Sequence, residues 1–378
     1  MISKRSAIRG CLLGLAVGDA MGYPVETKTW SQIQEDYGPY GLMGLDEVNG
    51  YADVTSHTQL AAFTCNGLLL GQTRGQVLGK MAPLVRYVEV AQQEWAIGQR
   101  RYDQPARNLC RVFRIQELRR RHCTDSRMVE TLNRSLERSR QKPDRLGALE
   151  APRNTYDDPA SIASAISVGL FAHSARGQLN QEELDRLGAE SVALTYGSPL
   201  AFLPGAVVTH LISRCIADQD TPLVTLVEDA MTALENQFGR EYHRHVKEIT
   251  KLVHQAVSMA ESRNLKPVDA MEKLKCGNGA QILAGAVYAA LLCEEDFDSA
   301  MIAAVNHSGR SAAAGCLTGA ILGARIGETE LPEFYTKSLE ITSVLHELGN
   351  DLVQGCPMTR DSKLFDADWD QKYLHGGN

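Results

Sequence analysis

The sequence predicts an all-α protein, and two observations lead to this expectation. Apolar residues recur at helical spacing along most of the chain, whereas the alternation that marks a half-buried strand is almost missing. Many of the periodic segments are also rich in Ala and Gly, which lets helices pack closely. We therefore expect a dozen or more helices in one domain over residues 1–356, followed by a C-terminal tail, 357–378, packed on the surface.

The first expected helix covers residues 6–22. Basic residues precede its apolar run, as in a signal peptide, but the run is only about ten residues long and is interrupted by Gly14, Gly18 and Asp19. A core helix is the better interpretation. The other periodic segments are 58–71, 76–97, 160–174, 182–194, 200–217, 222–237, 244–262, 280–292, 298–305 and 312–326.

Two of these helices have recognisable starts, and two polar stretches predict loops. Asn180 precedes two glutamates that suit the positive end of a helix, and Pro222 can sit in a first turn. The stretches 139–159 and 263–279 lack helical periodicity. Neither is long or biased enough to separate two domains, so they are expected to be surface loops.

Composition limits the classes of function. The 378 residues are 44% hydrophobic, ample for a large core, and the net charge of −7 argues against wholesale binding to nucleic acid or membrane surfaces. No stretch approaches the roughly 18 apolar residues that span a bilayer. Nine cysteines without a CxxC pair indicate buried thiols in a reducing compartment, so we expect a cytoplasmic protein.

Residues 303–324, AAVNHSGRSAAAGCLTGAILGA, look like a ligand-binding loop that leads into a helix. Backbone N–H groups at such a helix start can reach a phosphate or, with acidic side chains, a metal. The segment contains no carboxylate, and Arg310 stands where an acid would be useful. The candidate ligand-binding residues here are Asn306, His307, Ser308, Gly309, Arg310 and Ser311.

Three segments together resemble the ADP-ribosylglycohydrolase family, of the type that activates dinitrogenase reductase. They are GCLLGLAVGDAMGYPVE at residues 10–26, GYADVTSHTQL at 50–60, and the loop and helix at 303–324. The first segment matches the family's opening pattern GxxxGxAxGDxxGxPxE. The resemblance implies a compact, single-domain, all-helical fold and hydrolysis that removes ADP-ribose from modified side chains.

The resemblance also implies a binuclear magnesium site, with ligands from a Thr-Asp-Asp-Thr motif and a later Gly-Asp-x-Asp-Thr/Ser motif. In this sequence the first motif falls on Thr55-Ser56-His57-Thr58 and the second on residues 309–313, where Arg310 and Ala312 replace the aspartates. Hard divalent cations need several anionic oxygens. We therefore expect no magnesium and no other cofactor. The early segment adds Asp53, Thr55, Ser56 and Thr58 to the candidate ligand-binding residues.

The remaining polar residues leave alternatives open. Arg310 can pair with a nearby acid such as Asp53 or Glu26, or offer its guanidinium to phosphate oxygens. Glu26 can be a general base or a helix-end carboxylate that accepts a backbone N–H or Arg310. His57 can act as a base, or bind a transition metal together with His307. Glu26 and His57 are the candidate catalytic residues.

Basic residues concentrate in the segment 100–153, where fourteen arginines and Lys142 stand against seven acids, a local charge of +8. Arg119, Arg120 and Arg121, with Arg100, Arg101 and Arg114, can form a surface for an acidic protein partner. Stacking aromatics are not interleaved as a single-strand nucleic-acid binder requires. Salt bridges to the acidic remainder of the chain are the simpler explanation.

Three functional hypotheses follow. The first is a degenerate family member whose cleft still holds ADP-ribose or another phosphorylated small ligand. The second is an active enzyme with metal-independent chemistry that uses Glu26, His57 and Arg310. The third is a non-enzymatic module that binds a partner through the arginine-rich surface. The surroundings of Arg310 discriminate between the roles of its guanidinium: two carboxylates against it mean a salt bridge, and an open guanidinium means an anion site.

Overall fold

The computed structural model describes residues 2–79, 82–100, 108–122, 125–139, 147–175, 179–360 and 364–376, and in these ranges helices joined by loops make up the fold. The described part contains two isolated β-bridges and no strand. The all-α prediction is confirmed. The helices, in order, are α1 (Lys4–Gly22), η1 (Tyr23–Val25), α2 (Trp30–Tyr37), α3 (Ser56–Leu78), α4 (Leu84–Gly98), η2 (Arg111–Arg114), η3 (Glu117–Arg119), α5 (Ser126–Ser139), α6 (Ala163–Phe171), α7 (Gln181–Ala193), α8 (Pro199–Ala217), α9 (Leu223–Phe238), α10 (His243–Ser262), α11 (Pro267–Leu274), α12 (Gly279–Leu292), α13 (Phe297–Val305), α14 (Ser311–Ile326), η4 (Glu328–Glu330), α15 (Glu333–Lys337), α16 (Thr342–Gln354) and α17 (Ala367–Tyr373).

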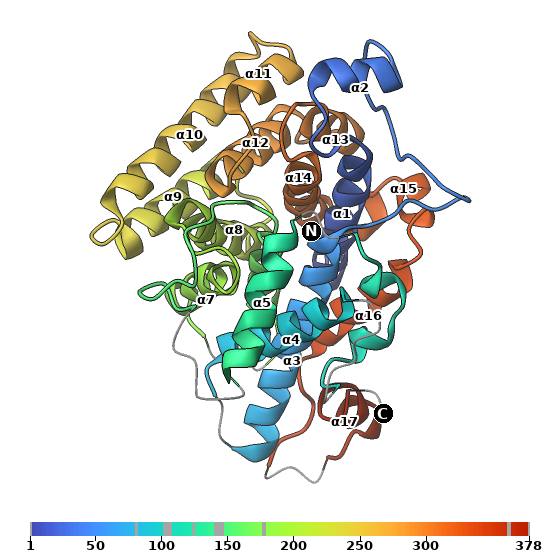
Figure 1. Cartoon of the computed structure of the whole chain (residues 1–378), viewed down its shortest axis with the longest axis vertical. Coiled ribbons are helices and arrows are strands. Elements are labelled where there is room, and N and C mark those ends of the chain that lie inside the picture. Colours follow the sequence, from blue (N-terminus) through green and yellow to red (C-terminus); the bar gives the residue numbers. More distant parts are fainter. Residues whose placement is uncertain are drawn as a thin grey trace.

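The helices α1 and α14 form the centre of the fold and pack backbone to backbone (Figure 1). Glycines of one helix face glycines of the other at three successive levels, so no side chains separate the two backbones there. A Cβ built on Gly14 would lie 2.1 Å from the carbonyl oxygen of Gly319, and one on Gly18 would lie 1.9 Å from that of Gly315. This contact brings the end of α1 and the start of α14 to the same place, where the candidate site lies.

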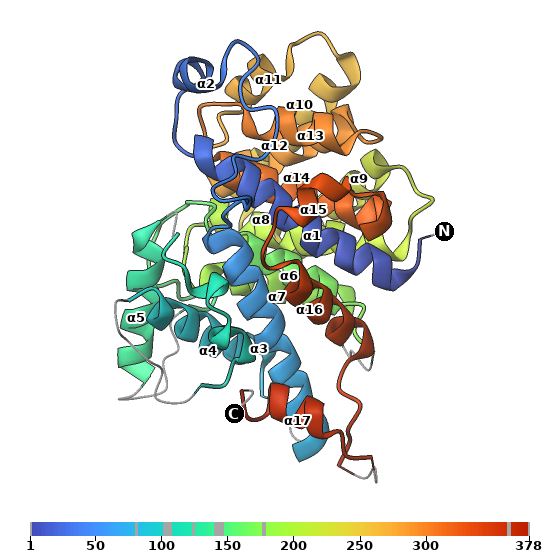
Figure 2. The ribbon, with the colours of Figure 1, turned by 90° about the vertical axis from the view of Figure 1, so that its right-hand side faces the viewer.

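The helices α3, α4 and α6 to α8 form the body beside this central pair (Figures 1 and 2). Within the described ranges, α8 is the one helix long and apolar enough, by length and composition, to cross a membrane. The expectation that no stretch approaches this length is therefore wrong. Since 78% of its apolar window is buried inside the protein, α8 has the character of a core helix.

Several boundaries and elements differ from the expectations. The periodic segment 76–97 contains the end of α3 and most of α4, because Gly79 adopts a left-handed conformation with φ 66° and stops α3. Asn180 caps α7 as expected, but Pro222 is the N-cap of α9 and lies before its first turn. Six helices have no counterpart among the predicted segments, namely α2, α5, α11, α15, α16 and α17.

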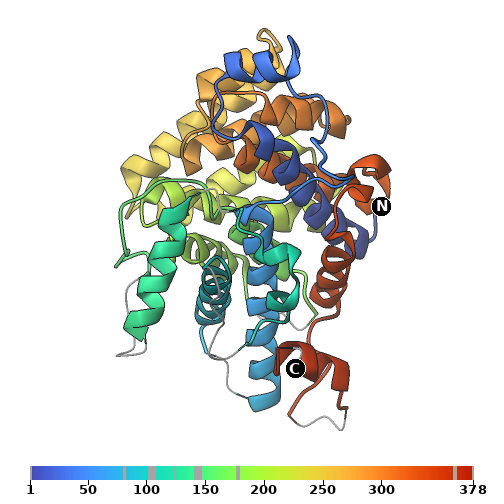
Figure 3. The same cartoon turned by 45° about the vertical axis from the view of Figure 1, so that its right-hand side comes forward.

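The described part of the tail ends in α17, which lies beside the C-terminal end of α3 (Figures 2 and 3). Trp369 is 3% exposed and donates its indole N–H to the hydroxyl of Thr73 at 2.9 Å. Tyr373 is buried and donates its hydroxyl to Asp351 at 2.5 Å. The tail is therefore attached to the body through buried aromatic side chains.

Candidate functional site

Asp19 connects the end of α1 to the start of α3. Its buried carboxylate accepts hydrogen bonds from the backbone N–H of Thr55 at 2.9 Å and of Thr58 at 3.0 Å. It also accepts from both threonine hydroxyls, each at 2.6 Å. A carboxylate at a helix N-terminus satisfies N–H groups that would otherwise lack partners. The hydroxyls of Thr55 and Thr58, which the sequence suggested for a ligand, are therefore engaged by Asp19.

Glu26 has the corresponding role at the start of α14. Its side chain is 10% exposed, and Oε2 accepts the backbone N–H of Ala312 at 2.8 Å while Oε1 contacts Arg310 at 3.4 Å. Burial raises the pKa of Glu26 to about 7, since loss of water outweighs the Ala312 N–H and the Arg310 charge, which both lower it. Both carboxylate oxygens thus have partners within the chain.

The guanidinium of Arg310 lies between two carboxylates. Its Nη1 faces Glu26, and its Nη2 makes a short hydrogen bond to Asp158, whose side chain is 6% exposed. Asp53, the other acid suggested for Arg310, pairs instead with Arg120 at 2.9 Å, so that part of the expectation is wrong. The surroundings of Arg310 are those of a salt bridge and not of an open anion site.

Asp158 was not identified from the sequence, and it extends the pairing further. Arg127 approaches Asp158 at 3.3 Å and pairs with Asp125 at 2.7 Å, and Asp125 accepts the hydroxyl of Tyr196 at 3.0 Å. We refer to Glu26, Arg310, Asp158, Arg127 and Asp125 as the ion-pair network. It joins the start of α14 to α5 and to the loop before α6.

His57 lies in the first turn of α3 and is 1% exposed. Burial lowers its pKa, although Asp19 and Asp158 oppose the change, and its Nδ1 has no hydrogen-bond partner. The neighbouring Ser56 donates its backbone N–H to the carbonyl of His122 at 3.0 Å. His57 is therefore a neutral imidazole with one ring nitrogen unsatisfied.

The loop before α14 uses its N–H groups within the chain. Ser308 donates to Glu272 at 2.6 Å, Gly309 to Nδ1 of His307 at 2.9 Å, and Arg310 to the carbonyl of Cys276 at 2.8 Å. The hydroxyl of Ser311 contacts the carbonyl of His307 at 3.4 Å. These contacts leave the N–H groups of 308–310 pointing at protein atoms, so the loop does not present them as an anion cradle.

Two further loop residues were proposed as ligands. The amide of Asn306 accepts the backbone N–H of Leu42 at 2.8 Å and donates to its carbonyl at 2.8 Å. His307 is buried, and burial lowers its pKa to about 4. Because Nδ1 accepts from Gly309, the ring proton sits on Nε2, which has no partner. No group of three or more His, Cys, Asp and Glu residues in the described ranges is arranged to hold a metal ion.

Among the described residues of the 100–153 segment, five arginines pair with acids of the same chain. Arg120 pairs with Asp53 and with Glu340, Arg111 makes a short contact with Glu347, and Arg153 makes a short contact with Glu89. Arg119 lies over the ring of Phe113 at 5.0 Å. Arg101 lies outside the described residues. These contacts agree with the salt-bridge explanation, and a partner-binding role for Arg119, Arg120 and Arg121 stays a prediction.

Comparison with known proteins agrees with the fold and the motifs. A model of the ADP-ribosylglycohydrolase family matches residues 2–362. The chain belongs to this family. A solved structure titled "ADP-ribosylglycohydrolase-related protein complex" superposes with a TM-score of 0.55, covering 93% of this chain and 99% of that chain. At 18% identity this likeness concerns the fold alone. No curated protein matches.

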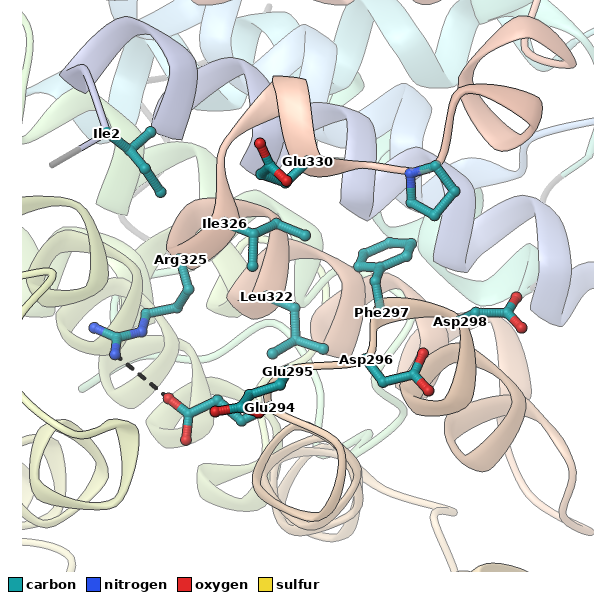
Figure 4. Close-up of a pocket in the computed structure, with 11 residues that line it drawn as sticks. Ile2, Glu294, Glu295, Asp296, Phe297, Asp298, Leu322, Arg325, Ile326 and Glu330 are labelled. Carbon is teal, nitrogen blue, oxygen red and sulfur yellow. Dashed lines mark hydrogen bonds and ion pairs between the residues drawn. The ribbon is translucent and has the colours of Figure 1, made fainter.

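This ADP-ribosylglycohydrolase-family protein has a separate pocket at the other end of α14 (Figure 4). Its volume is about 510 Å³, and its carboxylates are Glu294, Glu295, Asp296, Asp298 and Glu330 around an apolar floor. Arg325 pairs with Glu294 at 3.4 Å. At 1.5 Å per residue, the fifteen residues from Arg310 to Arg325 separate this pocket from the ion-pair network by roughly 20 Å. The carboxylates of this pocket are therefore not part of the site around Arg310.

Proposed function

We propose that this chain is a degenerate member of its family, which does not perform magnesium-dependent hydrolysis and whose cleft binds ADP-ribose or another phosphorylated small ligand. The observation that carries the first half is the position of the Arg310 guanidinium between Glu26 and Asp158. These two acids are the carboxylates in direct contact with Arg310, and Arg127 also pairs with Asp158, so cationic side chains already compensate much of their charge. They therefore offer a metal little uncompensated charge.

The residues at the counterpart positions of the family's metal ligands do not fit a magnesium pair. Ser56, His57, Arg310 and Ala312 supply no carboxylate, whereas magnesium requires several oxygen ligands in octahedral geometry. A guanidinium about 4 Å from a dication would repel it by on the order of 8 kcal/mol at an effective dielectric constant of 20. Binding of a magnesium pair would require Arg310 to leave both of its partners.

Support for the ligand half comes from two unsatisfied imidazole nitrogens. Buried polar atoms in proteins are nearly always hydrogen-bonded, so each exception needs an explanation, and a hydrogen bond to a bound ligand is one. Nδ1 of His57 and Nε2 of His307 are such exceptions. The N–H groups of the 308–310 loop are already occupied, so the proposal assigns recognition to the two histidines and not to the loop backbone.

A Mn²⁺ titration followed by electron paramagnetic resonance tests the metal half, because free Mn²⁺ gives a strong signal that binding removes. We expect wild-type protein to show no saturable binding below about 1 mM. The triple variant Ser56→Asp, His57→Asp, Arg310→Asp restores three acids and is expected to gain binding. A control for the arginine replacement, Arg134→Asp, makes the same charge change as Arg310→Asp at an exposed ion pair. Micromolar binding by the wild type would contradict the proposal.

Calorimetry with ADP-ribose in the presence of EDTA tests the ligand half separately. We expect one molecule bound per chain and weaker binding by His57→Phe, which retains a buried ring but has no ring nitrogen. His243→Phe, on the exposed side of α10, is the matched control. Absence of binding would reject the ligand half and leave the metal half standing.

A metal-independent hydrolase is the second candidate, favoured by one observation. Glu26 is buried with a pKa raised to about 7, which suits a general acid or base near neutral pH. Its two oxygens are, however, bonded to Ala312 and Arg310, so catalysis would need one of these contacts to open. Hydrolysis of ADP-ribosyl-arginine in EDTA by the wild type, lost in Glu26→Gln, would favour this candidate over the degenerate one.

A further inference from the structure

A groove of about 790 Å³ lies between α2, the start of α11 and the ends of α12 and α13, in the upper part of the molecule in Figure 1. This volume falls within the range of small-molecule sites, roughly 300 to 1,000 Å³. Its walls come from three stretches that are distant in the sequence, within 30–43, 263–269 and 292–306. The apolar side chains that line it include Trp30, Pro39, Tyr40, Met43, Leu265 and Ile302.

One wall is a loop that is fixed in place and nevertheless exposes apolar side chains. Leu42 is 4% exposed, and the buried amide of Asn306 bonds both its N–H and its carbonyl at 2.8 Å. Tyr40 and Met43, on either side, are 79% and 57% exposed. Exposed apolar groups gathered in one place often mark a binding surface. Since Leu42 is anchored, the exposure of its neighbours follows from the fold of the loop.

Trp30 forms the floor next to this loop. Its ring packs over the backbone of Gly41, where a Cβ would lie 2.8 Å from the Cζ3 atom of Trp30. Gly41 has φ 74°, a left-handed conformation that glycine adopts without strain. Glycine at this position therefore permits both the turn of the loop and the close approach of the indole ring to it.

The other end of the groove is cationic. Arg263 ends α10 in a left-handed conformation with φ 51°, and its Nη2 donates to the carbonyl of Leu292 at 2.9 Å. Lys266 is exposed and precedes the first turn of α11, where the helix dipole adds positive potential. Asp269 also lines the groove, so its charged residues sum to +1. This charge suits a monoanion better than a ligand with several phosphates.

We propose that the groove binds a small organic monoanion, whose flat apolar part packs on Trp30, Tyr40 and Met43 and whose acidic group meets Arg263 and Lys266. The chemical class is an aromatic or aliphatic carboxylate or sulfonate. The site is separate from the ion-pair network, and the proposal does not depend on the function proposed for that network.

Two fluorescent probes of similar shape test this proposal. 8-Anilinonaphthalene-1-sulfonate carries one negative charge, and N-phenyl-1-naphthylamine carries none. We expect the anionic probe to bind once per chain and to quench Trp30, which is half-buried, whereas Trp95 and Trp369 are buried. Lys266→Glu should weaken the anionic probe about sevenfold, from the Coulomb energy of reversing one charge about 7 Å away in water, and leave the neutral probe within about twofold.

Further variants separate the apolar and charged parts. Met43→Asp removes apolar contact and adds a negative charge. It should weaken the neutral probe about fivefold if roughly 40 Å² of contact is lost, and the anionic probe more, because the new charge repels it. Lys273→Glu reverses a charge on the exposed side of α11 outside the groove and should change neither affinity. The proposal is overturned if Lys266→Glu weakens both probes equally or neither, if Lys273→Glu acts as Lys266→Glu does, or if Met43→Asp has no effect. The replaced side chains are exposed, and circular dichroism checks that the variants fold.

Discussion

Replacing Arg310 with alanine is expected to destabilise the protein by about 3 kcal/mol at pH 8. The guanidinium contacts Glu26 and Asp158, whose side chains are only 10% and 6% exposed. Its removal leaves the buried Glu26 without a cation and leaves Asp158 with only Arg127, at 3.3 Å. Breaking a buried pair in this way costs about 3 to 5 kcal/mol. Arg310 is itself 21% exposed, and water that reaches it screens the pair, which places the cost at the lower end.

The loss in Arg310→Ala should depend on pH. Burial raises the pKa values of Glu26 and Asp158, and without the arginine, which lowers both, they rise further. A raised pKa in the folded state stabilises below the unfolded pKa, and this stability is lost as pH rises through the folded pKa. As pH falls, a larger share of both acids is neutral and needs no cation. The loss of stability should therefore be smaller at pH 5 than at pH 8.

Urea denaturation at the two pH values measures both effects. Arg134→Ala is the control, because its pair with Glu130 is exposed and is expected to contribute less than about 1 kcal/mol. A loss of less than about 1 kcal/mol in Arg310→Ala at pH 8, or an equal loss at both pH values, would refute the view that Arg310 stabilises buried carboxylates.

Three more predictions concern the residues around this network. Burial raises the pKa of Glu26 from 4.5 to about 7, so its ionisation should lower the free energy of unfolding of the wild type as pH rises between these values. At 1.36 kcal/mol per pKa unit, the decline amounts to about 3 kcal/mol. Urea denaturation should show that this decline is absent in Glu26→Gln. Asp19→Ala leaves buried donors at the start of α3 unpaired and should cost about 3 kcal/mol, seen as a lower urea midpoint; an unchanged midpoint would contradict the capping role. Gly18→Ala places a Cβ 1.9 Å from the carbonyl oxygen of Gly315 and should lower the melting temperature strongly. Gly44→Ala is the control, because nothing lies within 4 Å of its Cβ, and it should lower the melting temperature far less. Equal shifts in the two variants would refute the close packing of α1 and α14.

The sequence predicts the long apolar helices well and the polar or interrupted ones poorly. Periodicity located α1, α8 and α14, because apolar residues recur at helical spacing along each of them. It missed α5, which lies in the arginine-rich segment and buries only a few side chains along one face. The omission of α16 was avoidable, since Leu345, Leu348 and Leu352 follow the spacing of a helix face. Helix ends that depend on the backbone conformation of a single glycine were also missed.

In the candidate site, too, some residues could be predicted from the sequence and others could not. Motif spacing identified Glu26, Arg310 and the threonines of the early segment, because these residues lie within recognisable patterns. It could not identify Asp158, which lies 152 residues before its partner Arg310 in a polar stretch without a motif. Pairing of this kind depends on how helices are placed in space. For the same reason, the sequence could not indicate that the loop N–H groups are bonded to Glu272, His307 and Cys276.

The position of Arg310 also accounts for how Glu26 and Asp158 lie buried side by side in the site that we propose to be degenerate. Glu26 and Asp158 are buried close enough to one cation to contact it together, and two such charges raise each other's pKa when nothing neutralises them. A bound cation would relieve this repulsion, and so does a guanidinium attached to the chain. The attached charge needs no ion from solution, and its geometry is fixed by the N-cap position of Arg310 at the start of α14. Under the proposal of a degenerate site, Arg310 supplies positive charge as a bound cation would, but not the open coordination positions that metal-assisted hydrolysis requires.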